Sequence, residues 1–274
     1  MLLADLALRP EAQELVEQYS TKSEGKPRAI FQKTDVVNWE DLTKMFETAD
    51  REFGGIDLVC PGAGIFEPHW SNFWHPPGSD KSRDDPKGGR YALLDINITH
   101  PIRTTQLALQ YFLSPVHGTK ASATNPKRVV HISSIAGQVA GIPTPLYFAS
   151  KHAVSAFIRS LASLEDTIGI RVNGVAPGII KTPLWTEHPE KMGMLDESKD
   201  DWATPEEVAE AMLDLVEDAD LPGGTVLEVG HNNRRKVPLF NNPGPSGSGL
   251  SASGVSGTQE VFGWLADENW GKMK

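Results

Sequence analysis

The sequence of 274 residues has only one cysteine, Cys60, so the chain cannot form an internal disulfide bond and suits a reducing compartment. It lacks any apolar run of the roughly 18 residues that a membrane-spanning helix needs. Basic residues are also in deficit, with 26 lysines and arginines against 36 aspartates and glutamates. The resulting formal charge of −10 argues against nucleic acid and anionic membranes as main partners. We therefore expect a cytoplasmic protein that binds neither.

Three further absences narrow the class of protein. The eight histidines show no metal-site spacing, so no bound metal is expected. No segment repeats at the period of a solenoid protein, and the residues after Met1 lack the basic stretch of a signal peptide. The length is that of one sizeable domain with a core of its own.

Short apolar segments typical of β-strands alternate with segments that have apolar residues at helical spacing. Because short loops join them, the alternation predicts an α/β fold in which helices cover both faces of a mostly parallel, doubly wound sheet of the Rossmann type. The predicted strands span 2–5, 29–31, 56–60, 129–132, 170–175 and 225–229, and the predicted helices span 10–19, 38–53, 91–113, 204–216 and a segment that begins near residue 147.

The composition changes after Gly230. Residues 241–257 are rich in glycine, serine, asparagine and proline and carry too little apolar surface to order themselves. Residues 259–265 could form one or two helical turns that anchor the end of the chain. We therefore predict a domain over residues 1–230 and a flexible tail over residues 231–274.

The segment 128–152 carries the clearest sign of chemistry. Its strand ends at Ser133 and Ser134, and its helix places Tyr147 and Lys151 four residues apart on one face. A free tyrosine has a pKa of about 10 and is a poor base at neutral pH. A nearby ammonium favours the phenolate, so we expect Lys151 to lower the pKa of Tyr147 and make it useful for proton transfer.

Several short motifs follow one another along the chain: Thr34-Asp35-Val36, Gly62-Ala63-Gly64, Asn97, Ile132-Ser133-Ser134, Tyr147-Phe148-Ala149-Ser150-Lys151 and Pro177-Gly178 with Thr182. In this order they resemble the motifs of the short-chain dehydrogenase/reductase family over residues 2–230. Within the family the chain is most similar to NAD-linked 15-hydroxyprostaglandin and hydroxysteroid dehydrogenase-like members.

The resemblance implies an oxidoreductase that transfers a hydride between a nicotinamide cofactor and a secondary alcohol or ketone. Tyr147 is then the general acid and base, and Ser134, thirteen residues before it, holds the substrate oxygen, with Ser133 as the competing choice. Asn97 is implied to hold a water molecule that links Lys151 to solvent. The implied catalytic residues are Asn97, Ser134, Tyr147 and Lys151.

The same resemblance implies a set of cofactor-binding residues. Asp5 ends the first strand, where an acid binds ribose hydroxyls and repels a 2′-phosphate, so NAD is favoured over NADP. The implied set is Asp5, Asp35, Val36, Gly62, Ala63, Gly64, Tyr147, Lys151, Pro177, Gly178, Ile180 and Thr182. Family members commonly pair through the long helices, which implies a homodimer or homotetramer. Trp70, Trp74, Trp185 and Trp202 in the loops would suit an apolar substrate, and simple loop packing explains them equally well.

The chain departs from the family pattern in two places. Pro61-Gly62 stands where the family has two asparagines, so the hydrogen bonds of those side chains are missing. No strand followed by a glycine-rich turn precedes Asp5; that strand would lie between those of Asp5 and Leu58, and its turn would cradle the pyrophosphate. We therefore expect a fold incomplete at its N-terminus, as in a fragment or a chain with a mis-assigned start. Two interpretations stay open: an active oxidoreductase, and either an inactive truncated fragment or a non-catalytic binding relative.

Overall fold

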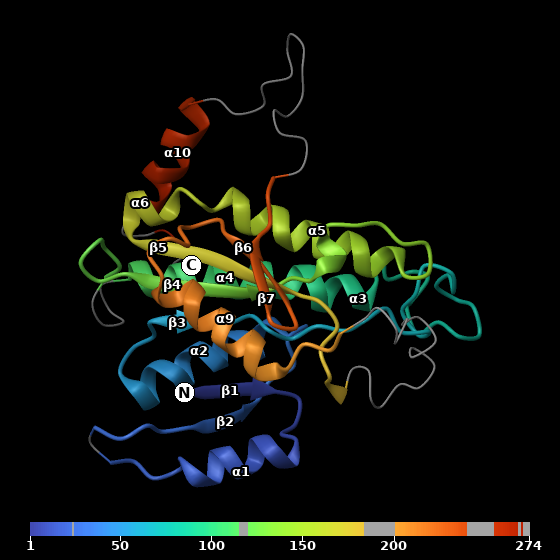
Figure 1. Cartoon of the computed structure of the whole chain (residues 1–274), viewed down its shortest axis with the longest axis horizontal. Helices are drawn as coiled ribbons and strands as arrows, with labels where there is room; N and C mark the ends of the chain where they lie inside the picture. The colour runs from blue at the N-terminus through green and yellow to red at the C-terminus, as the bar shows by residue number, and fades with distance from the viewer. Residues whose placement is uncertain (24, 115–119, 184–200, 240–254, 268–269, 271–274) are drawn as a thin grey trace.

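The structure is a computed structural model that describes all residues except 24, 115–119, 184–200, 240–254, 268–269 and 271–274. Its strands form two separate sheets (Figure 1). In the smaller sheet, β1 (Leu2–Asp5) pairs in parallel with β2 (Ile30–Lys33). The larger sheet has the order β3-β4-β5-β6-β7, from β3 (Leu58–Val59), β4 (Lys127–Ile132), β5 (Ile170–Pro177), β6 (Val226–Gly230) and β7 (Asn233–Lys236). The pairs from β3 to β6 are parallel, and β7 is antiparallel to β6.

The six predicted strands are confirmed, with shifts of a few residues at their ends. Among the described residues no ladder joins β1 to β3, although both strands have an edge without a partner. This is the position at which the family resemblance implied a further strand.

The predicted helices are confirmed, and two of their capping predictions hold in atomic detail. The side chain of Asn38 accepts a hydrogen bond from the backbone of Glu40 at the start of α2, and Thr204 forms a capping box with Glu207 at the start of α9. The helices are α1 (Pro10–Gln18), α2 (Trp39–Phe53), α3 (Ala92–Leu94), α4 (His100–Leu113), α5 (Pro145–Ser160), α6 (Leu164–Ile168), α9 (Pro205–Glu217) and α10 (Val255–Ala266).

The helix predicted over residues 91–113 is divided. A π-helical turn, η1 (Asp95–Thr99), separates α3 from α4. Pro101 has no N–H to donate to the carbonyl of Asn97, so an unbroken α-helical ladder cannot pass this point. The extra residue per turn places the side chain of Asn97 in the protein interior.

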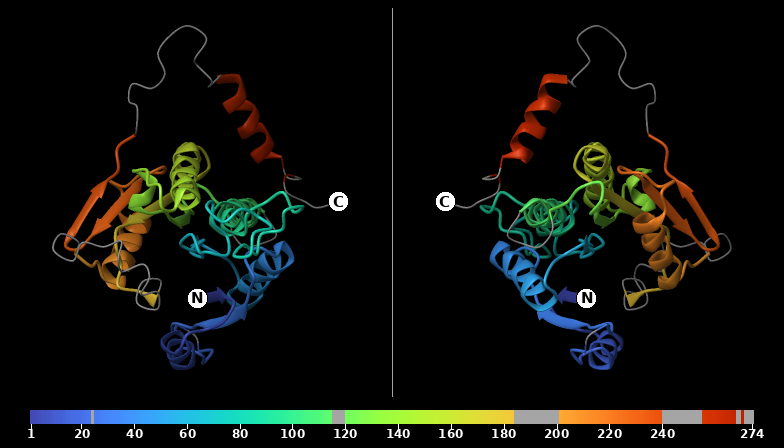
Figure 2. Two further views of the ribbon diagram at one scale, coloured as in Figure 1. Left: turned by 90° about the vertical axis from the view of Figure 1, so that its right-hand side faces the viewer. Right: turned by 90° about the vertical axis from the view of Figure 1, so that its left-hand side faces the viewer.

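Helices cover both faces of the larger sheet. Val129 and Val172 pack with residues of α2 and α4 on one face, whereas Val130 and Val175 pack with α9 on the other. Neighbouring side chains of one strand therefore pack against the helices on opposite faces of the sheet, as the alternation of side chains in a strand requires. Figure 2 shows α9 and the β6–β7 hairpin on one side of the molecule and α10 on the other.

The folded part of the chain extends beyond residue 230, contrary to the predicted boundary. Asn233–Lys236 forms β7 on the edge of the sheet, and the side chain of Val237 is buried. The prediction failed because all four residues of β7 are polar and exposed, so backbone pairing creates the strand without an apolar signal. The predicted linker 241–257 lies mostly outside the described residues. The predicted terminal anchor is present in α10, where Phe262 and Leu265 pack on the core.

Candidate active site

The carboxyl ends of β4 and β5 and the start of α5 converge on one place. The inward face of α5 repeats every three or four residues, with Ser150, Lys151, Val154, Ser155 and Ile158 buried. A β-carbon at Gly137, just beyond β4, would lie 2.8 Å from the carbonyl oxygen of Lys151. Glycine therefore permits the close packing that brings the end of β4 against α5.

Tyr147 is in the first turn of α5, and its ring packs on that of Phe66 with the centroids 4.8 Å apart. Burial raises the pKa of the Tyr147 phenol, and a hydrogen bond with Ser134 acts in the opposite direction. The structure thus places the two residues side by side. A lowered pKa was expected for Tyr147, and that expectation was wrong, because the cost of burying a phenolate is the larger effect.

Lys151 is buried one helical turn from Tyr147. Its ammonium donates a hydrogen bond of 2.9 Å to the carbonyl oxygen of Ile132 and lies 5.6 Å from the centroid of the Tyr147 ring. Burial lowers the pKa of Lys151 to about 8. The ammonium is therefore still mostly charged at neutral pH and lies next to the Tyr147 phenol.

The two serines at the end of β4 have different surroundings. Ser133 Oγ is 2.7 Å from Ser155 Oγ and donates to the carbonyl oxygen of Lys151, so it ties the strand to α5. Ser134 Oγ accepts a hydrogen bond from the backbone N–H of Ala136, donates a long one of 3.5 Å to the carbonyl oxygen of Pro177, and interacts with the Tyr147 phenol so as to lower its pKa. This geometry favours Ser134 over Ser133 as the partner of a reacting oxygen.

Asn97 lies in η1 and connects it to α5 and to the segment after β3. Its side-chain oxygen accepts from the backbone N–H of Ile65, and its amide nitrogen donates to the carbonyl of Ile65 and to Ser150 Oγ. A β-carbon at Gly64 would lie 3.4 Å from Asn97 Oδ1 and 3.7 Å from Lys151 Nζ. The absence of a side chain at Gly64 keeps the space above Lys151 open. The water implied for Asn97 stays a prediction.

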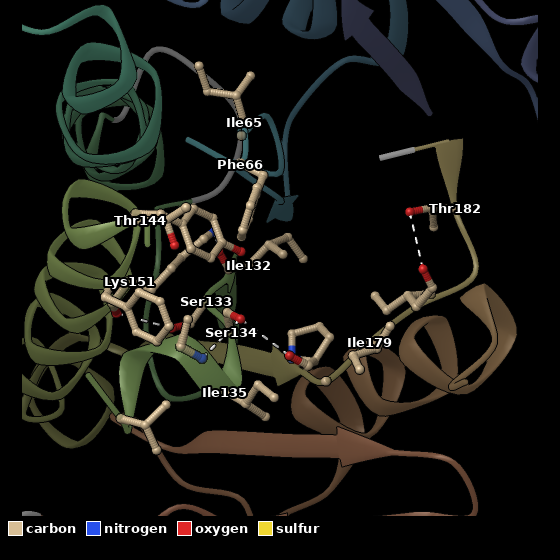
Figure 3. A pocket seen from close by; sticks show the side chains of 18 of the residues that line it. Ile65, Phe66, Ile132, Ser133, Ser134, Ile135, Thr144, Lys151, Ile179 and Thr182 are labelled. Carbon is tan, nitrogen blue, oxygen red and sulfur yellow. Dashed lines mark hydrogen bonds between the residues drawn. The ribbon is translucent and has the colours of Figure 1, made fainter. Parts of the chain in front are cut away.

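A cavity of about 880 Å³ opens in front of these residues. Figure 3 shows Phe66, Thr144 and Lys151 on one side of it and Ile179 and Thr182 across from them. The sequence analysis did not assign several apolar residues that line the cavity: Phe66, Ile135, Val139, Phe148 and Ile179. All of them except Val139 lie within two residues of a predicted motif, so their place in the chain could have indicated them. Trp70, Trp74 and Trp202 do not line the cavity, and Trp185 is outside the described residues.

The predicted cofactor residues divide into two groups. Gly62, Gly64, Tyr147, Lys151, Pro177, Gly178, Ile180 and Thr182 line the cavity, and Ala63 lies exposed between the two glycines. The open space above Gly64, beside a cationic lysine, fits the nicotinamide and ribose end of a nicotinamide cofactor. Among the described cavity-lining residues there is no carboxylate that would repel a cofactor phosphate.

The residues predicted for the adenosine end do not line this cavity. Asp5 is exposed at the end of β1, where its carboxylate accepts a 2.6 Å hydrogen bond from the backbone of Leu6. The carboxylate of Asp35 accepts from the backbone of Val37, and Val36 packs against the core. Strands β1 and β2 are parallel, so their carboxyl ends place Asp5 and Asp35 at the same edge. Among the described residues, no glycine-rich turn leads from a strand into a helix at this edge.

The described residues form neither a metal site nor a membrane-spanning helix. No three His, Cys, Asp or Glu side chains gather as ligands for a metal ion. No helix in the described part of the chain is long and apolar enough to cross a membrane.

The fold and the cluster of Ser134, Tyr147 and Lys151 define the class: an α/β protein with a serine, a tyrosine and a lysine gathered around a cavity at the carboxyl edge of a parallel sheet. Comparison with known proteins places the chain within this class. The family model for short chain dehydrogenase matches residues 4–193. L-fucose dehydrogenase of Bos taurus is 31% identical over 212 residues, covering 74% of this chain and 71% of the relative. The chain belongs to the short-chain dehydrogenase family, a family of oxidoreductases, as its motifs predicted.

Two other relatives widen the comparison. The NAD⁺-dependent 15-hydroxyprostaglandin dehydrogenase of Rattus norvegicus is 27% identical over 216 residues, covering 74% of this chain and 71% of the relative. A crystal structure of a short-chain dehydrogenase/reductase described as glucose/ribitol dehydrogenase from Brucella melitensis superposes with a TM-score of 0.58. That structure is 25% identical, and the match covers 83% of each chain. The relatives thus share the fold and differ in the alcohols for which they are named.

Proposed function

We propose that this protein transfers a hydride between NAD(H) and a secondary alcohol or ketone, with Tyr147 as general acid and base. The observation that carries the proposal is the half-buried Tyr147, whose phenol interacts with Ser134 and lies one turn from the buried Lys151 ammonium. A structural tyrosine would need neither the cavity in front of it nor the buried cation beside it.

When bound, the cofactor supplies or accepts the hydride. The protein's part is to hold the substrate oxygen with Ser134 and to move a proton at that oxygen. In the reducing direction the Tyr147 phenol donates its proton to the carbonyl oxygen, which becomes a hydroxyl. In the oxidising direction the phenolate takes the proton from the alcohol hydroxyl, and the charge of Lys151 stabilises the phenolate. Since burial raises the pKa of Tyr147, the phenol holds its proton at neutral pH and is ready for the reducing direction.

The cavity lining supports an apolar substrate. A sugar with several hydroxyls needs several polar partners, because a buried polar group without a hydrogen bond is costly. Beyond the proposed catalytic groups, the wall is formed largely by apolar side chains, among them Phe66, Ile135, Val139 and Phe148. An apolar alcohol or ketone can bury its surface against this wall, whereas a free sugar would leave its hydroxyls unpaired.

NAD is proposed over NADP because of Asp5. Its exposed carboxylate at the end of β1 would accept hydrogen bonds from ribose hydroxyls and repel a 2′-phosphate. A homodimer or homotetramer and a cytoplasmic location, predicted from the family resemblance and the composition, remain part of the proposal.

A second candidate is a non-catalytic relative that binds the cofactor weakly or not at all. The observation that favours it is the absence of a ladder between β1 and β3 in the described residues, at the position where a pyrophosphate cradle would be expected.

Titration of the purified protein with NADH, followed by fluorescence enhancement, tests the two candidates. Binding together with turnover of a hydrophobic secondary alcohol supports the oxidoreductase. No binding at millimolar NADH would exclude the oxidoreductase for this chain. Binding without turnover across a panel of steroid, prostaglandin and simple secondary alcohols would favour the second candidate.

A further inference from the structure

One acidic residue near the proposed active site has no role in the proton transfer. Glu67 is buried, with 5% of its surface exposed, yet its side chain does not line the cavity. Burying a carboxylate is costly unless hydrogen bonds compensate it, so its partners indicate what it does.

Both carboxylate oxygens of Glu67 accept hydrogen bonds from the backbone. One oxygen accepts from the N–H of Tyr147 at 2.9 Å, and the other accepts from the N–H of Phe73 at 2.9 Å. The first bond spans 80 residues of sequence and reaches the backbone of the residue proposed to exchange the proton.

The start of α5 needs such a partner. The first turn of a helix has N–H groups without helical acceptors, and Thr144, at the N-cap position, makes no side-chain capping bond. The first turn of α5 also contains no acidic residue of its own. Glu67 supplies a negative charge from a distant segment at this helix N-terminus, where the helix dipole favours an anion.

The segment that holds Glu67 is fixed along its length against the same group of residues. The backbone of Ile65 is held by Asn97, the ring of Phe66 packs on the Tyr147 ring, and Glu67 holds the Tyr147 amide. Tyr147 is therefore held at its ring and at its backbone by two consecutive residues.

The second hydrogen bond of Glu67 extends this arrangement into the loop beyond it. Phe73 is followed by Trp74, whose indole N–H donates to the carbonyl oxygen of Ile142 at 2.8 Å. Ile142 lies just before α5, so the loop that begins at Phe66 is fastened to the first turn of α5 and to the segment that leads into it.

We propose that Glu67 is a positioning residue, which holds the backbone of Tyr147 and thereby sets the place of its phenol relative to Ser134 and the substrate oxygen. The catalytic part of this inference rests on the proposed function. Small displacements of a reacting group lower rates strongly while leaving binding contacts intact, so the effect belongs in kcat.

Glu67→Gln tests the inference because the two side chains have the same shape. A glutamine oxygen can accept one of the two hydrogen bonds, but its NH₂ group then faces the other N–H donor. We expect kcat to fall by about tenfold or more, with KM and the Kd for NADH within about threefold of the wild-type values.

The chain offers a matched control in Glu207. This carboxylate also accepts two backbone hydrogen bonds at a helix N-terminus, from Thr204 and from Asn232, each of 2.7 Å. It lies at the start of α9 and does not line the cavity. Glu207→Gln should lower the Tm and leave kcat within about twofold of wild type, so a general loss of stability is separated from a loss of positioning.

A readout that needs no turnover comes from tyrosine amides. The chain has four tyrosines, so ¹⁵N-tyrosine labelling gives four backbone amide resonances, and Tyr147→Phe identifies the one from Tyr147. Glu67→Gln should move the Tyr147 resonance upfield more than the other three, whereas Glu207→Gln should not. In wild-type protein, the Tyr147 amide should also exchange slowly with solvent, although it has no helical acceptor.

Three results would overturn the inference: rapid exchange of the wild-type Tyr147 amide, an unmoved Tyr147 resonance in folded Glu67→Gln, or a kcat loss no greater than in Glu207→Gln. The exchange measurement decides the contact even if the variant does not fold. If wild-type protein turns over no substrate, the proposed function and the positioning of a reacting phenol both fail, whereas the resonance still decides whether Glu67 holds Tyr147.

Discussion

The two sheets of this molecule differ sharply in how deeply they are buried. All eight residues of β5 in the larger sheet are buried, and no residue of β1 in the smaller sheet is. Helix α1, which follows β1, also has no buried residue. Figure 1 shows the smaller sheet and α1 at one end of the molecule, with the larger sheet away from them.

The difference teaches where each part of the proposed chemistry rests. Ser134, Tyr147 and Lys151 are held by β4 and α5, which pack inside the core. Asp5 and Asp35, proposed for the adenosine end of the cofactor, follow strands with little buried surface and one unpaired edge. We therefore expect proton transfer to depend on a rigid part of the molecule and cofactor affinity to depend on a part that opens more easily.

The largest effect should follow a change in the buried part. Tyr147→Phe removes the hydroxyl that exchanges the proton and should lower kcat by about 10³-fold. The phenyl ring keeps its packing on Phe66, so the Kd for NADH should stay near the wild-type value. Steady-state kinetics and NADH fluorescence measure both quantities. Tyr111→Phe, on α4 away from the cavity, is the control and should keep full activity; full activity in Tyr147→Phe would refute the assignment.

A pair of isoleucine substitutions compares how firmly the two sheets are packed. Ile170 on β5 is fully buried, so Ile170→Ala should lower the free energy of unfolding by about 2–5 kcal/mol. Ile30 on β2 is only partly buried, so Ile30→Ala should cost about 1 kcal/mol. Urea unfolding followed by circular dichroism measures both. Equal costs would mean that the smaller sheet is packed as firmly as the larger one.

The buried charge of Lys151 should lower the free energy of unfolding. Because burial lowers its pKa from 10.5 to about 8, the folded state binds the proton more weakly than the unfolded chain does. The resulting loss of unfolding free energy is on the order of 3 kcal/mol. It is fully present below pH 8 and falls as the pH rises toward 10.5. Lys151→Met should therefore be inactive and more stable than wild type at pH 7, with an advantage that shrinks by pH 10.5. A difference in unfolding free energy that does not change with pH would contradict the buried ammonium.

The smallest effect is expected at the exposed end of β1. Asp5→Asn removes the charge that would repel a 2′-phosphate, so the preference for NADH over NADPH should fall by about tenfold or less. Fluorescence titration with both cofactors measures the ratio. Glu11→Gln, at an exposed carboxylate in the first turn of α1, is the control and should leave the ratio unchanged. An unchanged ratio in Asp5→Asn would remove Asp5 from the cofactor site.

The parts of the site that could be predicted are those encoded by neighbours in sequence. The spacing of Tyr147 and Lys151 on one helical face follows from the helix period alone, and Ser134 follows from the end of an apolar strand. By contrast, the choice between Ser133 and Ser134 could not be made from their identities. It depended on which hydroxyl is held by Ser155 and which one reaches Tyr147.

The errors have physical reasons of the same kind. The sign of the Tyr147 pKa shift depends on burial, which a spacing pattern does not report. The polar strand β7 forms because the edge of β6 offers hydrogen bonds, and its residues have no pattern that predicts this. Glu67 could not be found at all, because nothing near it in sequence indicates an amide 80 residues away.

The sequence by itself determined the alternation of strands and helices, the family and the residue types at the proposed proton-transfer centre, because local periodicity and short motifs encode them. Only the tertiary structure decided which edges stay unpaired, in which direction burial shifts the pKa of Tyr147 and Lys151, and which carboxylate holds the start of α5. These properties depend on distances between segments far apart in the chain, and such distances exist only once the chain has folded.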